Sequence, residues 1–405
     1  MTARVAILGP MRTPPPESRA ERSRMAVVRL LRERGTMSRA DIARAAGLSR
    51  STVSGIIAAL VEDDLVVELD ARLAPAGGGA GRPGAAVMLN PASGEAIGVD
   101  FGYRHVHVII ANVAHAVRIA KSVRLPVDYE PGRGFDLAAD LVRTAIAEAG
   151  TDPTRILGVG VSVPGPFDTR RGVPNSGMPS PWSGIPVAAE LGARLGLPVL
   201  ADGDTKLGAL AERRWGAARG CDEFVYMKLH GGVGGAFVSN GQLARGATGG
   251  AGEIGHLIVD ANGPLCRCGN RGCLETFVGL PVVMRALEPA YGDRLTLRNV
   301  ITMAWQGDRG CIRALSDAGA MAGRAVGMLG NILNPETVII GGALAAAGEL
   351  LMGPLREAAA AASLPLAGGV LTIQTGALGP QACALGAVAM VLGETDEKLL
   401  AAMGS

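Results

Sequence analysis

Between residues 21 and 62, apolar positions recur every three or four residues, and polar or glycine breaks divide the segment into three predicted helices. The first helix has an apolar face formed by Met25, Val28 and Leu31. Gly35 ends it, Ser38 caps the second helix, and Ser49 caps the third. The third helix has the most regular apolar stripe, formed by Val53, Ile56, Ile57, Leu60 and Val61.

The same unit continues with two short strands. Residues 63–68 lead into one strand, and residues 86–89 form its partner. Between them lies a loop rich in glycine, alanine and proline, residues 71–84, which ends in G-R-P-G and contains Arg82. Three helices followed by such a hairpin predict a winged helix-turn-helix. Residues 1–19 contain a run of prolines and no periodicity, so we expect a flexible tail.

From residue 93 onward, short apolar runs that predict strands alternate with amphipathic segments that predict helices. The expected strands are residues 96–100, 106–112, 156–163, 199–201, 224–229, 234–239, 337–340 and 371–374. The expected helices are residues 136–149, 187–195, 281–289, 299–306 and 312–333. This alternation is typical of α/β domains with a mixed, largely parallel sheet.

Composition narrows the classes of protein to which the chain can belong. With 405 residues it is long enough for more than one domain with its own core. The net charge of +2 identifies no partner, and no uninterrupted apolar run reaches the length of a membrane span. Three of the six cysteines lie close together and the others show no pairing pattern, so we expect a reducing, cytoplasmic location.

Local charge changes the interpretation of the N-terminal unit. Nine arginines lie between residues 19 and 50, against three acidic residues, and such an excess is typical of phosphate binding. Small hydroxyls and an arginine at the start of the third helix are residue types that reach base edges in the major groove; they are Arg50, Ser51, Thr52 and Ser54. We therefore predict that the unit binds double-stranded DNA. A protein-docking domain without affinity for DNA is the alternative.

The stretch from residue 252 to residue 275 contains four metal-ligating side chains within eighteen positions: His256, Cys266, Cys268 and Cys273. Three thiolates and an imidazole are a tetrahedral donor set found in closed structural zinc sites. Gly269 and Gly272 separate the sulfurs where the chain must turn tightly. Because no donor is left to hold an activated water, we predict a structural Zn²⁺ ion. The alternative is a group of buried or unpaired cysteines.

Two carboxylates, Glu253 and Glu275, bracket these donors. G-E-I-G-H followed by C-x-C-G-x-x-G-C-x-E resembles the signature of the ROK family, whose members are sugar kinases and sugar-responsive transcription repressors. The N-terminal module also resembles the DNA-binding domain of ROK repressors, including the G-R-P of the wing. The resemblance covers about residues 20–393. It implies that Arg82 enters a narrow minor groove.

The resemblance also implies the fold class, which is an α/β protein with an N-terminal winged helix-turn-helix followed by a two-lobed sugar-kinase/actin-like domain. In that architecture a last helix, here about residues 381–392, returns to pack on the first lobe. We therefore expect a winged helix-turn-helix at residues 20–92 and a first lobe made of residues 93–203 plus 381–398. Residues 204–380 form the second lobe, which carries the zinc site.

The segment that supplies the catalytic base in family kinases is altered. Asp204 matches the aspartate of the family motif N-D-x-N, but Gly203 and Lys206 replace the two asparagines. The glycine removes an amide that binds sugar. The lysine introduces a cation beside the base, which would hold Asp204 ionised and would also compete for it as an ion-pair partner. We regard Asp204 as a vestigial base.

The phosphate-binding loops depart further from the family pattern. Family kinases begin with D-x-G-G-T, whereas bulky Tyr103 and Arg104 stand at the positions of the second glycine and the threonine. Gly231 replaces the hydroxyl expected in the second loop. The adenosine-side segment N-P-E-T-V-I-I-G-G is intact. We predict that phosphoryl transfer is lost and that the chain is not an enzyme.

The resemblance implies that Glu253, His256 and Glu275 contact a sugar, with His256 also binding zinc. Together with Asp204, and with Asn175 in a loop that also holds Trp182, they form the predicted effector site. The alternative is that the two glutamates only support the zinc ligands. Lys206 or Arg104 would suit an anionic group on a modified or phosphorylated sugar.

The sequence as a whole predicts a cytoplasmic, DNA-binding transcription regulator, controlled by a sugar or sugar derivative bound between the lobes. A homodimer or homotetramer would match the two-fold symmetry of operator half-sites. Relief of repression by the effector is the expected sign of control. The alternative is an ATP-dependent, glucokinase-like sugar kinase with an attached DNA-binding module.

Overall fold

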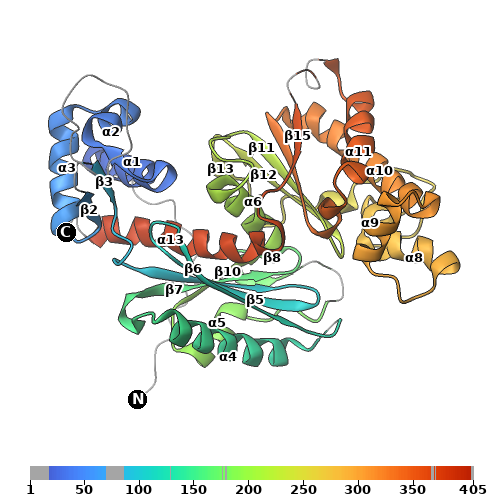
Figure 1. Ribbon diagram of the computed structural model, residues 1–405, viewed down its shortest axis with the longest axis horizontal. Helices are drawn as coiled ribbons and strands as arrows, with labels where there is room; N and C mark the ends of the chain where they lie inside the picture. The colour runs from blue at the N-terminus through green and yellow to red at the C-terminus, as the bar shows by residue number, and fades with distance from the viewer. Residues whose placement is uncertain are drawn as a thin grey trace.

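The computed structural model describes residues 18–69, 86–127, 129–175, 177, 180–365, 369 and 371–402. The predicted wing loop with Arg82, and all of the predicted tail except its last two residues, lie outside the described residues. Three α/β or helical bodies are visible in Figure 1: a blue N-terminal module, a green lobe below it and an orange lobe beside it. Within the described residues, no helix is long and apolar enough to cross a membrane.

The N-terminal module has the elements that the apolar pattern predicts. They are α1 (Arg19–Arg34), β1 (Met37–Ser38), α2 (Arg39–Ala46), α3 (Arg50–Glu62), β2 (Val66–Leu69) and β3 (Ala86–Leu89). Ser38 and Ser49 cap α2 and α3, each accepting a bond of 3.1 Å from a backbone N–H in the first turn. Val53, Ile57 and Leu60 are fully buried in the core, but Val61, predicted to point inward, is 39% exposed.

The first lobe is a five-stranded sheet in the order β10-β7-β4-β5-β6. Its strands are β4 (Glu95–Phe101), β5 (His105–Asn112), β6 (Val117–Arg124), β7 (Ile156–Val163) and β10 (Val199–Gly203). Helices α4 (Pro131–Ala149) and α5 (Val187–Leu195) cover one face and bury the lobe's larger apolar cluster. A short hairpin of β8 (Phe167–Asp168) and β9 (Val173–Pro174) lies between β7 and α5 along the chain, and a 3-10 turn, η1 (Pro153–Arg155), precedes β7.

The second lobe is a five-stranded sheet in the order β13-β12-β11-β14-β15. Its strands are β11 (Phe224–Leu229), β12 (Val233–Ser239), β13 (Gln242–Leu243), β14 (Thr337–Gly341) and β15 (Thr372–Thr375). Its helices are η2 (Ile254–His256), α7 (Glu275–Val278), α8 (Leu280–Tyr291), α9 (Leu297–Trp305), α10 (Arg309–Leu333), η3 (Ala343–Ala347) and α11 (Glu349–Ala362). The long helices α10 and α11 pack against each other over the main apolar cluster of this lobe.

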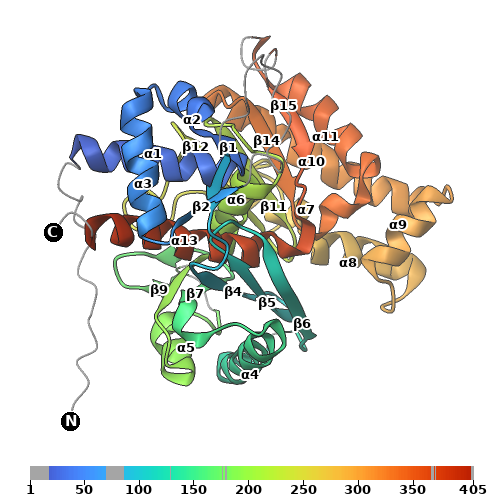
Figure 2. The same ribbon diagram turned by 60° about the vertical axis from the view of Figure 1, so that its left-hand side comes forward.

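Two helices join the lobes: α6 (Asp204–Trp215) and α13 (Ala382–Ala402), which follows the 3-10 turn η4 (Gly379–Gln381). Figure 2 shows α13 running across the first sheet, as the family resemblance implies, although it continues well past the predicted end at residue 392. Gly98 and Gly160 allow this close packing, because a side chain at either position would collide with carbonyl oxygens of α13. The helix thereby buries Ala384 and Val388 against the sheet.

The N-terminal module rests on the first lobe and on α13. Arg32 in α1 is only 8% exposed, and its Nε donates a bond of 3.4 Å to the carbonyl of Val113. His115, also buried, packs on Trp215 of α6 with ring centroids 4.7 Å apart and an angle of 54° between the ring planes. Arg32 therefore belongs to the junction between the domains, and the cationic excess counted from the sequence overstates the charge that faces outward.

Candidate functional site

The four predicted metal donors lie together at the end of η2, which carries His256, and in the loop that follows it, which carries the three cysteines. The donor atoms of His256, Cys266, Cys268 and Cys273 all lie within 4.8 Å of one another. Isolated bridges between Ile258 and Cys273 and between Leu265 and Arg271 hold the loop closed. Gly269 and Gly272 take positive φ values of 91° and 67°, as expected where the chain turns around the sulfurs.

The distances within this cluster fit a tetrahedral metal better than a disulfide. The sulfurs of Cys268 and Cys273 are 3.6 Å apart, as are Cys266 Sγ and His256 Nδ1. A tetrahedron with metal–sulfur bonds of about 2.3 Å has edges of about 3.8 Å, whereas a disulfide needs about 2.05 Å. The cysteines are all free thiols. The four side chains are therefore arranged to bind a metal ion.

Glu275, the first residue of α7, connects this metal-binding loop to the glycine-rich turn after β11. Its Oε1 accepts a bond of 3.0 Å from Arg267 Nε and lies 3.7 Å from Cys266 Sγ. Its Oε2 lies so close to Gly232 that a Cβ there would approach it to 2.9 Å. Arg267 is mostly exposed, while the Glu275 side chain is 11% exposed. Glu275 therefore already contacts the metal-binding loop. This contact agrees with its alternative predicted role, in which it supports the zinc ligands.

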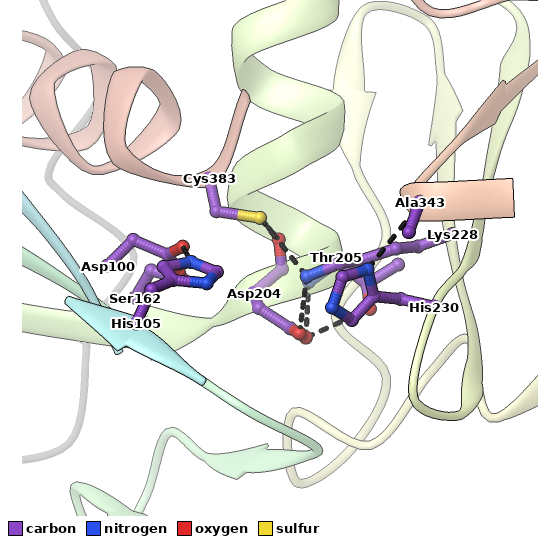
Figure 3. A network of polar contacts seen from close by, with 9 residues as sticks. All are labelled: Asp100, His105, Ser162, Asp204, Thr205, Lys228, His230, Ala343 and Cys383. Atoms are coloured by element: carbon purple, nitrogen blue, oxygen red, sulfur yellow. Dashed lines mark hydrogen bonds and ion pairs between the residues drawn. The ribbon is translucent and has the colours of Figure 1, made fainter. Parts of the chain in front are cut away.

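Asp204, the predicted vestigial base, is held by a lysine that the sequence did not single out. Lys228 of β11 places its Nζ 2.7 Å from Asp204 Oδ2, with the two side chains 16% and 17% exposed (Figure 3). Burial would lower the pKa of Lys228, but the attractions of Asp204, Cys383 and Asp100 together outweigh it and raise that pKa well above its usual value. Lys206, which we expected beside the base, is not its ion-pair partner. The feature of the sequence that could have identified Lys228 is its position as the only charged residue in an otherwise apolar strand.

The same network reaches the first lobe. Cys383 at the start of α13 lies 3.3 Å from Lys228 Nζ, and its Sγ is 3.4 Å from the carbonyl of Asp204. Burial raises the pKa of Cys383 to about 12, although Lys228 opposes this effect. Asp100 of β4 accepts bonds of 2.6 Å from Ser162 Oγ and 2.9 Å from His105 Nε2. Polar side chains of the protein itself therefore bind one another at this end of the first sheet.

Asp100, His105 and His107 lie close enough to suggest a second metal site. Their geometry argues against it, because the two imidazole rings are stacked at 3.9 Å with only 26° between their planes. A metal lies in the plane of each ligating imidazole, and nearly parallel rings do not point their lone pairs at one position. Burial would raise the pKa of Asp100, but the bond from His105 and the charge of Lys228 outweigh it and lower that pKa to about 2. Asp100 is therefore an ionised partner of His105.

The two altered phosphate loops face each other. Tyr103 is 41% exposed, and its ring lies 3.6 Å from where a Cβ on Gly231 would stand. Next to Gly231, His230 accepts a bond of 3.2 Å from the Ala343 N–H at its Nδ1 (Figure 3). Burial and the charge of Lys228 lower the pKa of His230 to about 4, so the ring is neutral near pH 7. A tyrosine ring and a histidine thus lie beside the glycine-rich turn.

Most residues predicted to bind an effector lie around the start of α6. Glu253 immediately precedes η2, and His256 ends that turn. Burial, with repulsion from Asp204 and Glu275, raises the pKa of Glu253 despite the opposing charge of Lys206. Because His256 Nδ1 faces the cysteines, its Nε2 is the nitrogen left for another partner. The four carboxylate and imidazole side chains are therefore neighbours.

The remaining two predicted positions behave differently. Asn175 is exposed, and its side-chain oxygen accepts a bond of 3.3 Å from the Gly177 N–H. No hydrogen bond joins Asn175 to the other effector-site candidates among the described residues. Trp182 is 5% exposed and packs on Phe101 and Phe135, with centroids 5.0 and 5.7 Å away. Trp182 is thus a core residue of the first lobe, and its place in a loop near a sugar stays a prediction.

The predicted DNA-reading positions lie on one end of α3. Arg50, Ser51 and Thr52 are exposed, and Ser54 is half-buried. The hydroxyls of Ser51 and Thr52 lie 2.9 and 2.8 Å from the Ser49 hydroxyl that caps the helix. Several other arginines of the module are neutralised by ion pairs: Arg24 with Asp63, Arg39 with Glu68 and Arg44 with Asp41. Arg50 has no such pair within the described part of the chain.

Comparison with known proteins identifies the family. The family model described as ROK matches residues 96–394. The chain belongs to the ROK family. A second model, described as an IclR helix-turn-helix domain, matches residues 25–70 of this ROK protein. The first match spans both lobes and the second spans the three N-terminal helices, so the predicted fold class is confirmed.

Individual relatives of this ROK protein include regulators and kinases. It is 28% identical to the xylose repressor of Caldicellulosiruptor bescii over 385 residues, which cover 92% of this chain and 96% of the relative. It is 31% identical to the glucokinase of Thermotoga maritima over 310 residues, which cover 73% of this chain and 96% of that enzyme. The kinase match thus covers less of this chain than the repressor match does.

A solved structure of a ROK family transcriptional regulator, a homologue of the Escherichia coli MLC protein, has the same overall fold. The TM-score is 0.77 at 21% identity, and the match covers 94% of this chain and 98% of that one. The ROK hexokinase of Thermus thermophilus superposes with a TM-score of 0.61 at 27% identity, covering 75% of this chain and 99% of the enzyme.

Proposed function

We propose that this ROK protein is a DNA-binding transcriptional regulator and that it acts as a repressor. The observation that carries the proposal is the exposed N-terminal end of α3, where Arg50 forms no ion pair with any described residue, on a winged helix-turn-helix that is packed on a ROK domain. The extent of similarity to a xylose repressor supports it, because that match covers 92% of this chain, more than the ROK domain alone. Ser51, Thr52 and Ser54 accompany Arg50 in the major groove, and Arg82 enters the minor groove from the wing.

The effector of this regulator is a sugar or sugar derivative. It binds Asp204, Glu253, His256, Glu275 and Asn175, and the carboxylates of this set suit the hydroxyls of a pyranose. A Zn²⁺ ion bound by His256, Cys266, Cys268 and Cys273 fixes two of these side chains. The donor set and its tetrahedral spacing support zinc, whose part is to hold the loop rigid.

We infer that phosphoryl transfer is lost. Catalysis would need Asp204 free to accept a hydroxyl proton, but Lys228 occupies it. A nucleotide would also need close backbone approach at two loops, where Tyr103 now lies against Gly231. The competing function is a sugar kinase, favoured by the glucokinase relative and by the intact segment at residues 334–342. Release of ADP with any hexose, lost in Asp204→Asn, would favour the kinase.

The regulator acts as a homodimer or homotetramer, since two-fold symmetric operators need two reading helices. Effector binding between the lobes shifts their relative position, and the first lobe passes this shift to the N-terminal module through the junction at Arg32 and α13. A cytoplasmic location follows from this function.

The decisive experiment is genomic or in-vitro selection of DNA sites with the full chain, followed by titration of Arg50→Ala against the selected site. Loss of a base contact would weaken specific binding by about 1–3 kcal/mol and leave non-specific binding nearly unchanged. Arg298→Ala, an exposed arginine on α9 far from α3, is the matched control. A protein that selects no discrete sites would refute the proposal in favour of protein docking. Unchanged binding by Arg50→Ala would refute only the recognition-helix assignment.

A further inference from the structure

The C-terminal end of α10 carries large apolar side chains that remain in contact with water. Met328 and Leu333 are each 39% exposed, and Ile332 is 73% exposed. The rest of this long helix packs on α11 and on the main apolar cluster of the second lobe. Isolated apolar side chains are ordinary on a protein surface, but a group of them on one element is typical of a contact site. We call these three residues the α10 patch.

The surface beside the α10 patch is hollowed. The hollow has a volume of about 280 Å³, and its apolar lining consists of Phe237, Ile254, Leu257, Leu329, Ile332 and Leu333. Glu253 is the one charged residue among its lining residues. Such a lining does not suit the hydroxyls of a sugar, and the volume lies below the roughly 300–1,000 Å³ of typical small-molecule sites. The hollow is therefore better suited to apolar side chains of another protein surface than to the effector.

Opposite charges flank the α10 patch. Arg324 lies four residues before Met328, hence on the same face of the helix, and it is exposed. Glu336 lies three residues after Leu333 and is also exposed, with its Oε2 3.6 Å from Cys221 Sγ. Neither Arg324 nor Glu336 forms an ion pair with any residue that the structure describes. The patch thus has a cation on one side and an anion on the other, each available to an external partner.

These residues are spaced symmetrically along the chain. Arg324 and Glu336 each lie six residues from Gly330. Met328 and Ile332 each lie two residues from the same glycine. In a two-fold symmetric contact, the same surface is used by both subunits, so a residue on one side meets its symmetry-related counterpart on the other. A partner of unrelated sequence would require no such spacing, which favours a second copy of this chain.

We propose that a second copy of this chain docks on the α10 patch through a two-fold axis that crosses α10 near Gly330. In this contact Met328 packs against the partner's Ile332, which also enters the hollow, and Arg324 lies beside the partner's Glu336. The inference rests on the proposed function, because it specifies the surface through which the regulator forms its dimer. Figure 1 shows α10 in the orange lobe, well away from the blue N-terminal module, so the contact leaves α3 exposed for DNA.

The first test is sedimentation velocity of the full, zinc-loaded chain over a series of concentrations. Ile332→Arg places a charge in the partner's hollow and should raise the dissociation constant of the dimer about ten-fold or more. Because Ile332 is mostly exposed, the variant should keep the urea midpoint and circular dichroism of the wild type. Ile312→Arg is the matched control, since it makes the same change at an exposed position twenty residues earlier on α10 and should leave the dimer unchanged.

The second test exchanges the flanking charges. Arg324→Glu and Glu336→Arg each bring like charges together across the two-fold axis, so each single variant should weaken the dimer. The double variant Arg324→Glu/Glu336→Arg restores opposite charges and should return the dissociation constant to within about three-fold of the wild type. A merely structural role of either residue would not give this rescue. If the wild type does not dissociate at the lowest concentration, the rate of subunit exchange between two fluorescently labelled pools gives the same comparison.

Three outcomes would overturn the inference. A chain that stays monomeric at every concentration removes this contact and the proposed dimer together, while site-specific DNA binding is measured independently. A dimer that Ile332→Arg and the charge variants leave unchanged has its interface elsewhere, so the proposed regulator stands and only this contact fails. A dimer weakened by the single charge variants but not rescued by the double variant refutes the two-fold register at Gly330, and with it the proposed contact.

Discussion

Replacing Lys228 with methionine would leave the Asp204 carboxylate without the ammonium that it binds. The two charges are 2.7 Å apart, and each side chain is about one-sixth exposed, at 16% and 17%. With an effective dielectric constant of about 20, their attraction is about 6 kcal/mol. The hydration lost by both groups offsets much of this attraction, and removal of one partner from a buried pair costs about 3–5 kcal/mol. Because water still reaches this pair, we expect a loss of about 3 kcal/mol.

The assay is urea unfolding at pH 7, followed by tryptophan fluorescence. Trp182 lies in the core of the first lobe and Trp215 lies at the junction of the domains, so both lose their surroundings on unfolding. At an unchanged denaturant slope, a lower midpoint measures the lost free energy. The double variant Lys228→Met/Asp204→Asn contains neither charge and should recover most of the loss, because no unpaired carboxylate remains.

The control and the refuting result both come from comparing the single variants with the double variant and the wild type. Asp204→Asn alone should also destabilise the protein, since it leaves the Lys228 ammonium buried without its partner. A double variant as unstable as the Lys228 single variant would show that packing of the lysine stem matters, not the ion pair. A single variant within about 0.5 kcal/mol of the wild type would show that the pair adds nothing to stability.

Two further predictions concern the metal-binding loop and the domain junction. Cys268→Ser should reduce the zinc content measured on purified protein and lower the unfolding midpoint, whereas Cys221→Ser, outside the cluster, should change neither; a full complement of zinc in Cys268→Ser would contradict the site. Burial, with the charges of Arg214 and Arg32, lowers the pKa of His115 to about 2, so the unfolded chain binds a proton near pH 6.5 that the folded chain does not. Stability is therefore full above pH 6.5 and is lost as the pH falls, by about 1.4 kcal/mol at pH 5.5; His115→Phe should remove that part of the slope, and an unchanged pH profile would disprove it.

The N-terminal module and the metal-binding loop were predictable because their causes are local. Ser38 and Ser49 bond to N–H groups three residues away, and the spacing of apolar residues decides which side of α3 is buried. The four metal donors lie within one short loop, so their spacing alone brings them near one another. Strands β11 and β14 can likewise be recognised in the sequence as apolar runs, because both of their faces are covered.

Some helices and strands were not predicted, because their hydrophobic pattern in the sequence is weak. Helix α11 ends in a run of alanines, where small side chains give little contrast between a buried and an exposed face. Strand β6 forms the edge of its sheet, and polar side chains alternate along most of it. The extension of α13 past residue 392 was missed because the residues that come next, 393–398, are glycine or polar and interrupt the apolar pattern.

Only the tertiary structure determined which charged side chains contact each other. From the sequence, Lys206 is the expected cation beside Asp204, two residues away on the same helix, yet Lys228 from strand β11 of the second lobe forms the ion pair with that carboxylate. The sequence analysis included Arg32 in the DNA-binding charge, but in the folded protein its side chain donates a hydrogen bond to the Val113 carbonyl. Trp182 stood in a loop next to a predicted sugar contact and turned out to be core. A hydrophobic period specifies the face of a helix or strand, whereas ion pairing over long sequence separations depends on how those faces dock, and docking follows from the packing of whole elements.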